Sequence, residues 1–211
     1  MSRLANCPSC GAQVQFRFAQ AVQTACPYCQ SVIVRTNVDL EKVGEVAALP
    51  PDPSPIQLYT EGIIGNKAFQ VVGRLTYSYE QGFWNEWHLL FHDNTTGWLA
   101  DAQAQYAYSQ LVAPPSRLPA KGKLKRGQTF HWPQGEFTLT HLTVARYVGF
   151  EGELPFATDG RHEETVFADL KSPTAAFATI DYSKDPPLLF MGRIVTFDEL
   201  QLKNLKMFEG W

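Results

Sequence analysis

Two cysteine pairs, Cys7-Pro8-Ser9-Cys10 and Cys26-Pro27-Tyr28-Cys29, decide how the first part of this 211-residue chain folds. Each pair has the spacing C-x2-C, and fifteen residues separate the two pairs. Such a pair turns a short loop so that both sulfurs point the same way. Two facing loops supply four thiolates in a tetrahedron, which is the ligand set of structural zinc sites. The pattern predicts a structural zinc ion held by Cys7, Cys10, Cys26 and Cys29.

The residues around the cysteines fit a zinc ribbon. Gly11 follows the first pair, where a positive φ aims backbone N–H groups at the sulfurs, and Gln30 takes the matching place after the second pair. Residues 13–18 alternate apolar and polar side chains, and residues 31–35 form a return strand. About 36 residues cannot bury a sufficient core, so we expect the metal to supply most of the folding free energy, about 10–16 kcal/mol apparent for small zinc modules.

A redox-active C-x-x-C pair is the alternative interpretation of these cysteines. That motif usually opens a helix of an α/β unit, whereas here a β-alternating stretch follows. Four sulfur ligands also leave no open coordination position for a substrate. We therefore expect a structural role for the site, and we assign no catalytic residue.

Composition limits the class of protein. Apolar residues make up 45% of the chain, enough for a packed core, and all four cysteines lie in the ribbon, so no disulfide framework remains. No leader-like or membrane-spanning run is present, which predicts a cytoplasmic protein without membrane insertion. Residues 1–36 contain Arg3, Arg17 and Arg35 and no acid, although the whole chain carries a formal charge of −3. This is a weak indication of nucleic-acid binding.

The rest of the chain divides at a proline-rich stretch. We expect a zinc ribbon over residues 1–36, a short helix and a proline-rich linker over 37–56, and a β-rich domain over 57–211. The linker contains four prolines between residues 50 and 55 and predicts a stiff spacer between ribbon and body.

The body is predicted to be an antiparallel meander or a pair of small barrels. Period-two alternation marks strands over 69–79, 87–91, 98–100 and 106–108, and again over 137–148, 165–170, 176–182 and 188–197, with a short closing helix from Asp198 to Leu205. The halves 57–112 and 127–211 share this pattern of successive short strands with period-two alternation. The strings Trp98-Leu99-Ala100-Asp101 and Val166-Phe167-Ala168-Asp169 also resemble each other, which allows a duplicated module.

Three groups of side chains in the body are candidates for sites. The aromatic residues between 77 and 98 include Trp84, which lies near a turn and is the candidate contact for a ligand or partner, while Trp87 shares the buried face of its strand. His88 and His92 are four apart on a strand, too distant to share a metal, and are expected to face solvent. Four carboxylates were considered for acid–base chemistry, although their spacing favours no pair: Glu86, Asp101, Glu151 and Glu153.

Several strings together resemble one family. They are the two cysteine pairs, Ala68–Leu75, Trp84-Asn85-Glu86-Trp87-His88-Leu89, Gly97-Trp98-Leu99 and Glu151–Phe156. They are similar to bacterial proteins of the domain-of-unknown-function family 4178, in the form that carries an N-terminal zinc ribbon. The resemblance covers nearly the whole chain. It implies a β-rich fold with no assigned activity, and it carries over a role only for the four cysteines.

The sequence therefore predicts a non-catalytic zinc-ribbon protein that binds a protein partner or a small ligand through its β body. Two alternatives stay open at this point. One is a nucleic-acid-associated factor that uses the arginines of the ribbon, and the other is an enzyme with its site in the β body.

Overall fold

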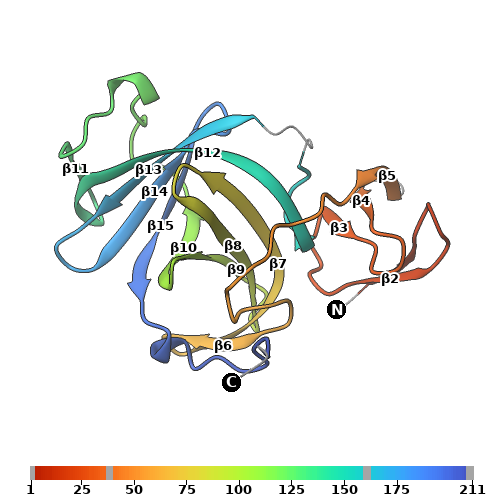
Figure 1. Cartoon of the computed structure of the whole chain (residues 1–211). Coiled ribbons are helices and arrows are strands. Elements are labelled where there is room, and N and C mark those ends of the chain that lie inside the picture. Colours follow the sequence, from red (N-terminus) through yellow and green to blue (C-terminus); the bar gives the residue numbers. More distant parts are fainter. Residues whose placement is uncertain (1–2, 37–39, 159–162, 208–211) are drawn as a thin grey trace.

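The computed structural model describes residues 3–36, 40–158 and 163–207, and nearly all of the regular structure in these residues is antiparallel β-strand (Figure 1). Two short 3-10 turns, η1 (Lys121–Lys123) and η2 (Asp198–Leu200), are the helical elements of the described chain. None of its helices is long and apolar enough to cross a membrane. The strands are β1 (Arg3–Asn6), β2 (Gln13–Phe16), β3 (Gln23–Ala25), β4 (Ser31–Arg35), β5 (Leu40–Glu45), β6 (Glu61–Ile64), β7 (Lys67–Tyr79), β8 (Gly82–Phe91), β9 (Thr96–Ala102), β10 (Gln105–Val112), β11 (Thr129–Trp132), β12 (Gly135–Leu154), β13 (Glu164–Lys171), β14 (Ala176–Asp181) and β15 (Leu188–Val195).

The body is a closed ring of eight strands. Pairing runs β7-β8-β9-β10-β15-β14-β13-β12, and β12 pairs with β7 to close the ring. Every pair is antiparallel. These pairings confirm the prediction of a β-rich antiparallel body. Closure into a barrel also leaves few free strand edges.

Two five-strand meanders contribute four strands each to this ring, and their first strands, β6 and β11, pair outside it. Strands β6 to β10 follow one another as hairpins, strands β11 to β15 do the same, and the meanders meet at the β7–β12 and β10–β15 pairs. The strings that suggested a repeat do not occupy matching places, because Trp98–Asp101 lies in β9, the fourth strand of its meander, and Val166–Asp169 lies in β13, the third. A common origin of the two halves stays a prediction.

The inward face of the ring is identified by ring contacts across it. Trp84 on β8 lies 5.4 Å from Phe167 on β13, centroid to centroid, and these strands are three places apart around the ring. Side chains alternate along a strand, so Glu86 and His88 share the inward face with Trp84, whereas Trp87 and Leu89 face outward.

The outward face carries the largest apolar clusters, and neighbouring chain segments cover them. In the first meander, Trp87, Leu89 and Phe91 pack with Ile56 and with Leu200 near the C-terminus. In the second meander, the outward residues of β12 to β15 pack under the connection that carries Leu118 and Leu124. The apolar face predicted for 87–91 is buried and points away from the ring centre. The face predicted for 69–79 is divided by a β-bulge between Val71 and Gly73, so that Phe69 and Val71 pack in the outward cluster whereas Leu75 and Tyr77 lie on the inward face.

The ribbon joins the ring directly. Strand β12 leaves β7 after the Gly152–Gly73 pair and continues into a short pairing with β3 through Glu153 and Leu154. Gly152 has φ +70°, and a Cβ on it would approach the Val72 carbonyl oxygen to 2.3 Å. Only glycine therefore permits this crossing, which lets β12 extend the sheet into the ribbon strands β3, β4 and β5.

Two expectations about the segments between and after these elements are wrong. The short helix expected within 37–46 is strand β5 over its described residues, because Leu40–Glu45 hydrogen-bonds to β4. Residues 37–39, which include the expected cap Asp39, lie outside the described residues. The closing helix from Asp198 is only the one-turn η2, and a left-handed Gln201 ends it.

The proline-rich stretch is more than a spacer between the ribbon and the ring. Its Asp52 pairs with Arg74 of β7 and accepts a hydrogen bond from Asn85 Nδ2. The stretch therefore lies against the ring, and the ribbon packs on the ring instead of standing off at a fixed distance.

Candidate functional site

The two cysteine turns have the same backbone geometry. In the first, Cys7 N donates to Ala12 O and Gly11 N donates to Cys7 O; in the second, Cys26 N donates to Ser31 O and Gln30 N donates to Cys26 O. Gly11 and Gln30 both have positive φ, at 75° and 57°, as their equivalent places in the sequence predicted. Each turn therefore presents two sulfurs to a common centre.

The four sulfurs lie at the corners of a small tetrahedron. The Sγ atoms of Cys7 and Cys29 are 3.7 Å apart, those of Cys10 and Cys26 are 3.8 Å apart, and all four lie within 4.8 Å of one another. Sulfurs about 2.3 Å from one zinc ion are separated by about 3.8 Å in a tetrahedron. The cluster thus fits a tetrahedral metal ion.

The thiols of this cluster are not paired as disulfides, and their surroundings favour thiolate at one position. The hydroxyl and backbone N–H of Ser31 lower the pKa of the Cys29 thiol to about 6. Thiolate is the form that binds metal. Cys7 and Cys26 are buried with Val14, Phe16 and Ile33, so the cluster is also the centre of the ribbon's small core.

A second buried group lies where the ribbon meets the ring. The carboxylate of Glu153, 4% exposed, accepts hydrogen bonds from the backbone N–H groups of Arg17 and Phe18, each at 2.8 Å. Burial raises the pKa of Glu153, while the two N–H donors act in the opposite direction. The sequence named this residue only as a candidate acid or base, and its structural role could not be read from spacing.

Three carboxylates lie on the inward face of the ring. Glu86 shares the face of Trp84, Asp181 is the register partner of the inward Phe167, and Asp169 lies two residues beyond Phe167. Their hydrogen-bond donors are neutral: the Trp84 indole N–H for Glu86, the Thr179 hydroxyl for Asp169, and Ser183 for Asp181.

Burial raises the pKa of all three inward carboxyl groups, for Glu86 to about 8, and the neighbouring acids act in the same direction on Glu86. Sequence analysis missed Asp169 and Asp181 as members of this group. They are far from Glu86 along the chain, and only ring closure brings them to the same face.

His88 corrects a sequence expectation, because it is fully buried and does not face solvent. Its Nδ1 lies 3.0 Å from the Glu153 carbonyl oxygen, its ring stacks on Trp98, and the edge of Phe18 from the ribbon contacts it. Burial lowers the pKa of His88 to about 4, so the imidazole is neutral at pH 7. His92, by contrast, is exposed, as expected.

Trp84 is partly buried and is packed within the chain. Its ring stacks on Tyr77 at 5.0 Å and meets Tyr79 and Phe167 edge-on. Its Nε1 donates to Glu86. The exposed surface of the indole stays available for a contact, but its N–H group and its aromatic faces already contact residues of the ring.

The other carboxylates, and Arg17 and Arg35 of the ribbon, also have partners within the chain. Glu151 pairs with Arg74 at 2.9 Å, and Arg74 lies 5.1 Å from the Trp87 ring centre. The Arg17 guanidinium lies 4.3 Å above the Tyr59 ring, and that of Arg35 lies 6.0 Å from the Phe16 ring. Asp101 accepts a hydrogen bond from the Ser54 hydroxyl. The four carboxylates named as candidates for acid–base chemistry therefore have different partners and do not converge on one reaction centre.

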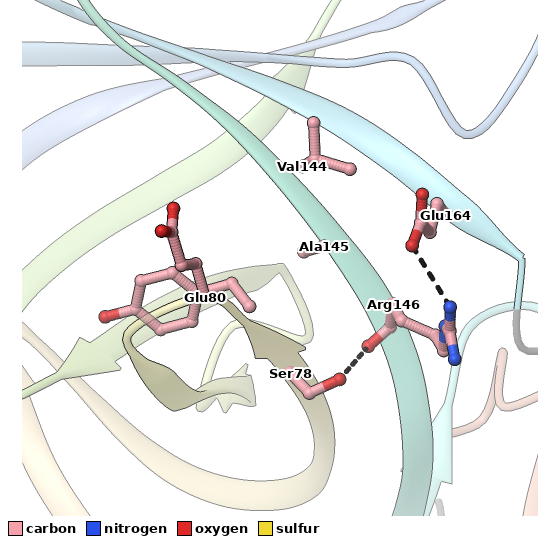
Figure 2. A pocket seen from close by; sticks show the side chains of 7 residues that line it. Ser78, Glu80, Val144, Ala145, Arg146 and Glu164 are labelled. Carbon is pink, nitrogen blue, oxygen red and sulfur yellow. Dashed lines mark hydrogen bonds and ion pairs between the residues drawn. The ribbon is translucent and has the colours of Figure 1, made fainter.

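Two open cavities lie on the surface of the described residues. One, of about 370 Å³, lies over the Arg74 ion pairs and is bordered by Tyr59 and Lys206. The other, of about 300 Å³, lies where β7, β12 and β13 meet, and Figure 2 shows that the ion pair of Arg146 with Glu164 crosses it. Neither cavity gathers a nucleophile with a base.

The fold and the cysteine cluster together define a closed antiparallel β-barrel with a small module packed against it, whose four cysteines have the geometry of a metal site. The chain belongs to the family described as a domain of unknown function, DUF4178, whose model matches residues 60–197. The match begins one residue before β6 and ends just after β15, so it covers the ring and leaves out the ribbon. No curated protein and no solved structure shows significant similarity to the chain.

Proposed function

We propose that the ribbon holds one structural zinc ion through Cys7, Cys10, Cys26 and Cys29, and that the protein is a non-catalytic binding component. The separation of the sulfurs, 3.7 and 3.8 Å for the two measured pairs, carries this proposal, because it matches the edge of a zinc–thiolate tetrahedron. Four protein ligands fill that coordination shell, which favours a structural role. A reducing cytoplasm is part of the proposal, since the site needs four free thiols.

Metal analysis of the purified protein tests the zinc site. We expect close to one zinc ion per chain, and Cys26→Ser should lower the zinc content strongly because the ligand is buried and has no substitute nearby. Ser9→Ala is the matched control, since Ser9 lies in the same turn and is exposed. A wild-type chain that is folded throughout and free of bound metal would refute the zinc site.

The binding role belongs to the ring in this proposal, and Trp84 is its candidate contact for a protein partner or a small ligand. It is supported by the partial exposure of Trp84 beside Tyr77 and Tyr79. Co-purification from native cells should recover a component with the wild-type chain and recover less of it with Trp84→Ala. The control is Phe83→Ala, an exposed aromatic neighbour on the opposite face of the same strand. Equal recovery with all three chains would exclude Trp84 as the contact.

A further inference from the structure

Glu153 lies where the ribbon loop between the two cysteine turns meets the ring. Both of its carboxylate oxygens are occupied by ribbon N–H groups, Oε1 by Arg17 and Oε2 by Phe18. Hydrogen bonds to an ionised carboxylate are stronger than those between neutral groups, and a buried carboxylate without donors is costly. Glu153 therefore stabilises the ribbon only in the position that presents these two N–H groups together.

Other contacts around Glu153 tie the same loop to the ring. Gln23 and Thr24 of β3 pair with Leu154 and Glu153, and Val22 N donates to Leu154 O at 2.9 Å. The side chains flanking Glu153 also take part: Phe18 packs edge-on against His88, and Arg17 covers Tyr59. All the ribbon residues in these contacts lie between Cys10 and Cys26, so their relative position depends on how the two cysteine turns are held.

The docked ribbon covers inward-facing side chains at one end of the ring. Val32 of the ribbon is buried in one cluster with Leu75 and Trp98, which face inward on β7 and β9. His88 lies beneath Phe18 at the same end and is fully buried. Removal of the ribbon from this position would expose His88, Leu75 and Trp98 to solvent (Figure 1 shows the ribbon beside the end of β12).

We propose that metal binding by the four cysteines and docking of the ribbon on the ring are thermodynamically coupled through Glu153, which makes the ribbon a metal-dependent cover for this end of the ring. The inference rests on the proposed zinc site. Without metal, the loop from Gln13 to Ala25 loses the constraint that places the Arg17 and Phe18 N–H groups together, and the cover opens. Coupling of this kind is reciprocal, so a weaker dock also means weaker metal binding.

The reciprocal effect is measured with the full-length, zinc-loaded chain in competition with a chelator. Glu153→Gln keeps the shape of the side chain but removes the charge, and its amide group turns one donor toward a backbone N–H. We expect zinc affinity to fall about tenfold, the usual weight of charge-assisted hydrogen bonds. Tyr59→Ala removes only the ring beneath Arg17 and is partly exposed, so it folds readily, and a fall of about threefold is expected.

Glu164→Gln is the matched control, because Glu164 is exposed and pairs with Arg146 away from the ribbon. Its zinc affinity should stay within about twofold of wild type, as expected for an exposed ion pair. Wild-type affinity in both Glu153→Gln and Tyr59→Ala would overturn the coupling while leaving the zinc site itself intact. A wild-type chain without zinc would instead refute the proposed function, so the two failures are distinguishable.

Hydrogen–deuterium exchange on the wild-type chain tests the other direction and needs no variant. Removal of zinc should speed exchange at β3, at residues 153–154 and around His88, while β13 and β14 on the far side of the ring keep their protection. Unchanged protection at β3 and residues 153–154 after zinc removal would show that the ribbon stays docked without metal, and the proposal would then be wrong.

Discussion

The ribbon and the ring of this protein bury very different amounts of apolar surface. The ribbon's core cluster contains seven buried residues, and two of them are cysteines. The two outward clusters of the ring contain eleven and ten buried residues, with Trp87, Leu89, Leu139 and Leu170 almost fully enclosed. The ring can therefore fold on hydrophobic burial, whereas we expect the ribbon to depend on the proposed metal ion and on its contacts with the ring. This difference can be tested at four points.

The largest effect is expected from the metal site. Cys26→Ser should unfold the ribbon, because structural zinc contributes about 10–16 kcal/mol apparent in modules of this size. Residues of β2 to β4 should lose protection from hydrogen exchange, while β13 and β14 keep theirs. Loss of protection in the whole chain at once would mean that ribbon and ring form one cooperative unit.

Truncation of a side chain in the ring core should destabilise the ring and leave the ribbon's zinc content unchanged. Leu89→Ala removes a fully buried side chain from the first outward cluster and should lower the free energy of unfolding by about 2–5 kcal/mol. Urea denaturation measures this change, and zinc content per folded chain should not alter. Leu111→Ala, at an exposed position of β10, is the control and should change stability by less than about 0.5 kcal/mol.

A smaller, pH-dependent effect is expected on the inward face. The folded protein raises the pKa of Glu86 from its ordinary value to about 8, chiefly through burial. Between about pH 4.5 and 8 the folded state therefore keeps a proton that the unfolded chain releases, and the contribution of Glu86 to stability is lost as the pH rises through this range. Glu86→Gln removes the titration.

The measurement for Glu86 is the difference in unfolding free energy between Glu86→Gln and wild type as a function of pH. The variant should gain about 1–3 kcal/mol relative to wild type between pH 4.5 and 8.5, less than the full pKa shift allows because Glu86 is only partly buried. A difference that does not vary with pH would show that Glu86 is ionised within the fold.

The smallest effect is expected at the tip of the second cysteine turn. Tyr28 is 71% exposed although it lies between two candidate metal ligands. Tyr28→Ser should change stability by less than about 0.5 kcal/mol and leave zinc content unchanged. A strong loss of zinc in this variant would show that Tyr28 stabilises metal binding although its side chain is exposed.

The sequence by itself determined the cluster of four cysteines and the β class. Two C-x2-C pairs bring four sulfurs together through local turn geometry, and period-two alternation identifies strands such as β7 and β8, because both depend on neighbours in the chain. Only the tertiary structure decided which face of each strand looks into the ring, that Glu86, Asp169 and Asp181 share that face, and that Glu153 holds the ribbon. The physical reason is closure: the β7–β12 and β10–β15 pairs join residues far apart in the sequence, and burial then sets the charge state of groups such as Glu86 and His88. The helix expected near residue 40 failed for the same reason, since pairing with β4 outweighed a weak local preference.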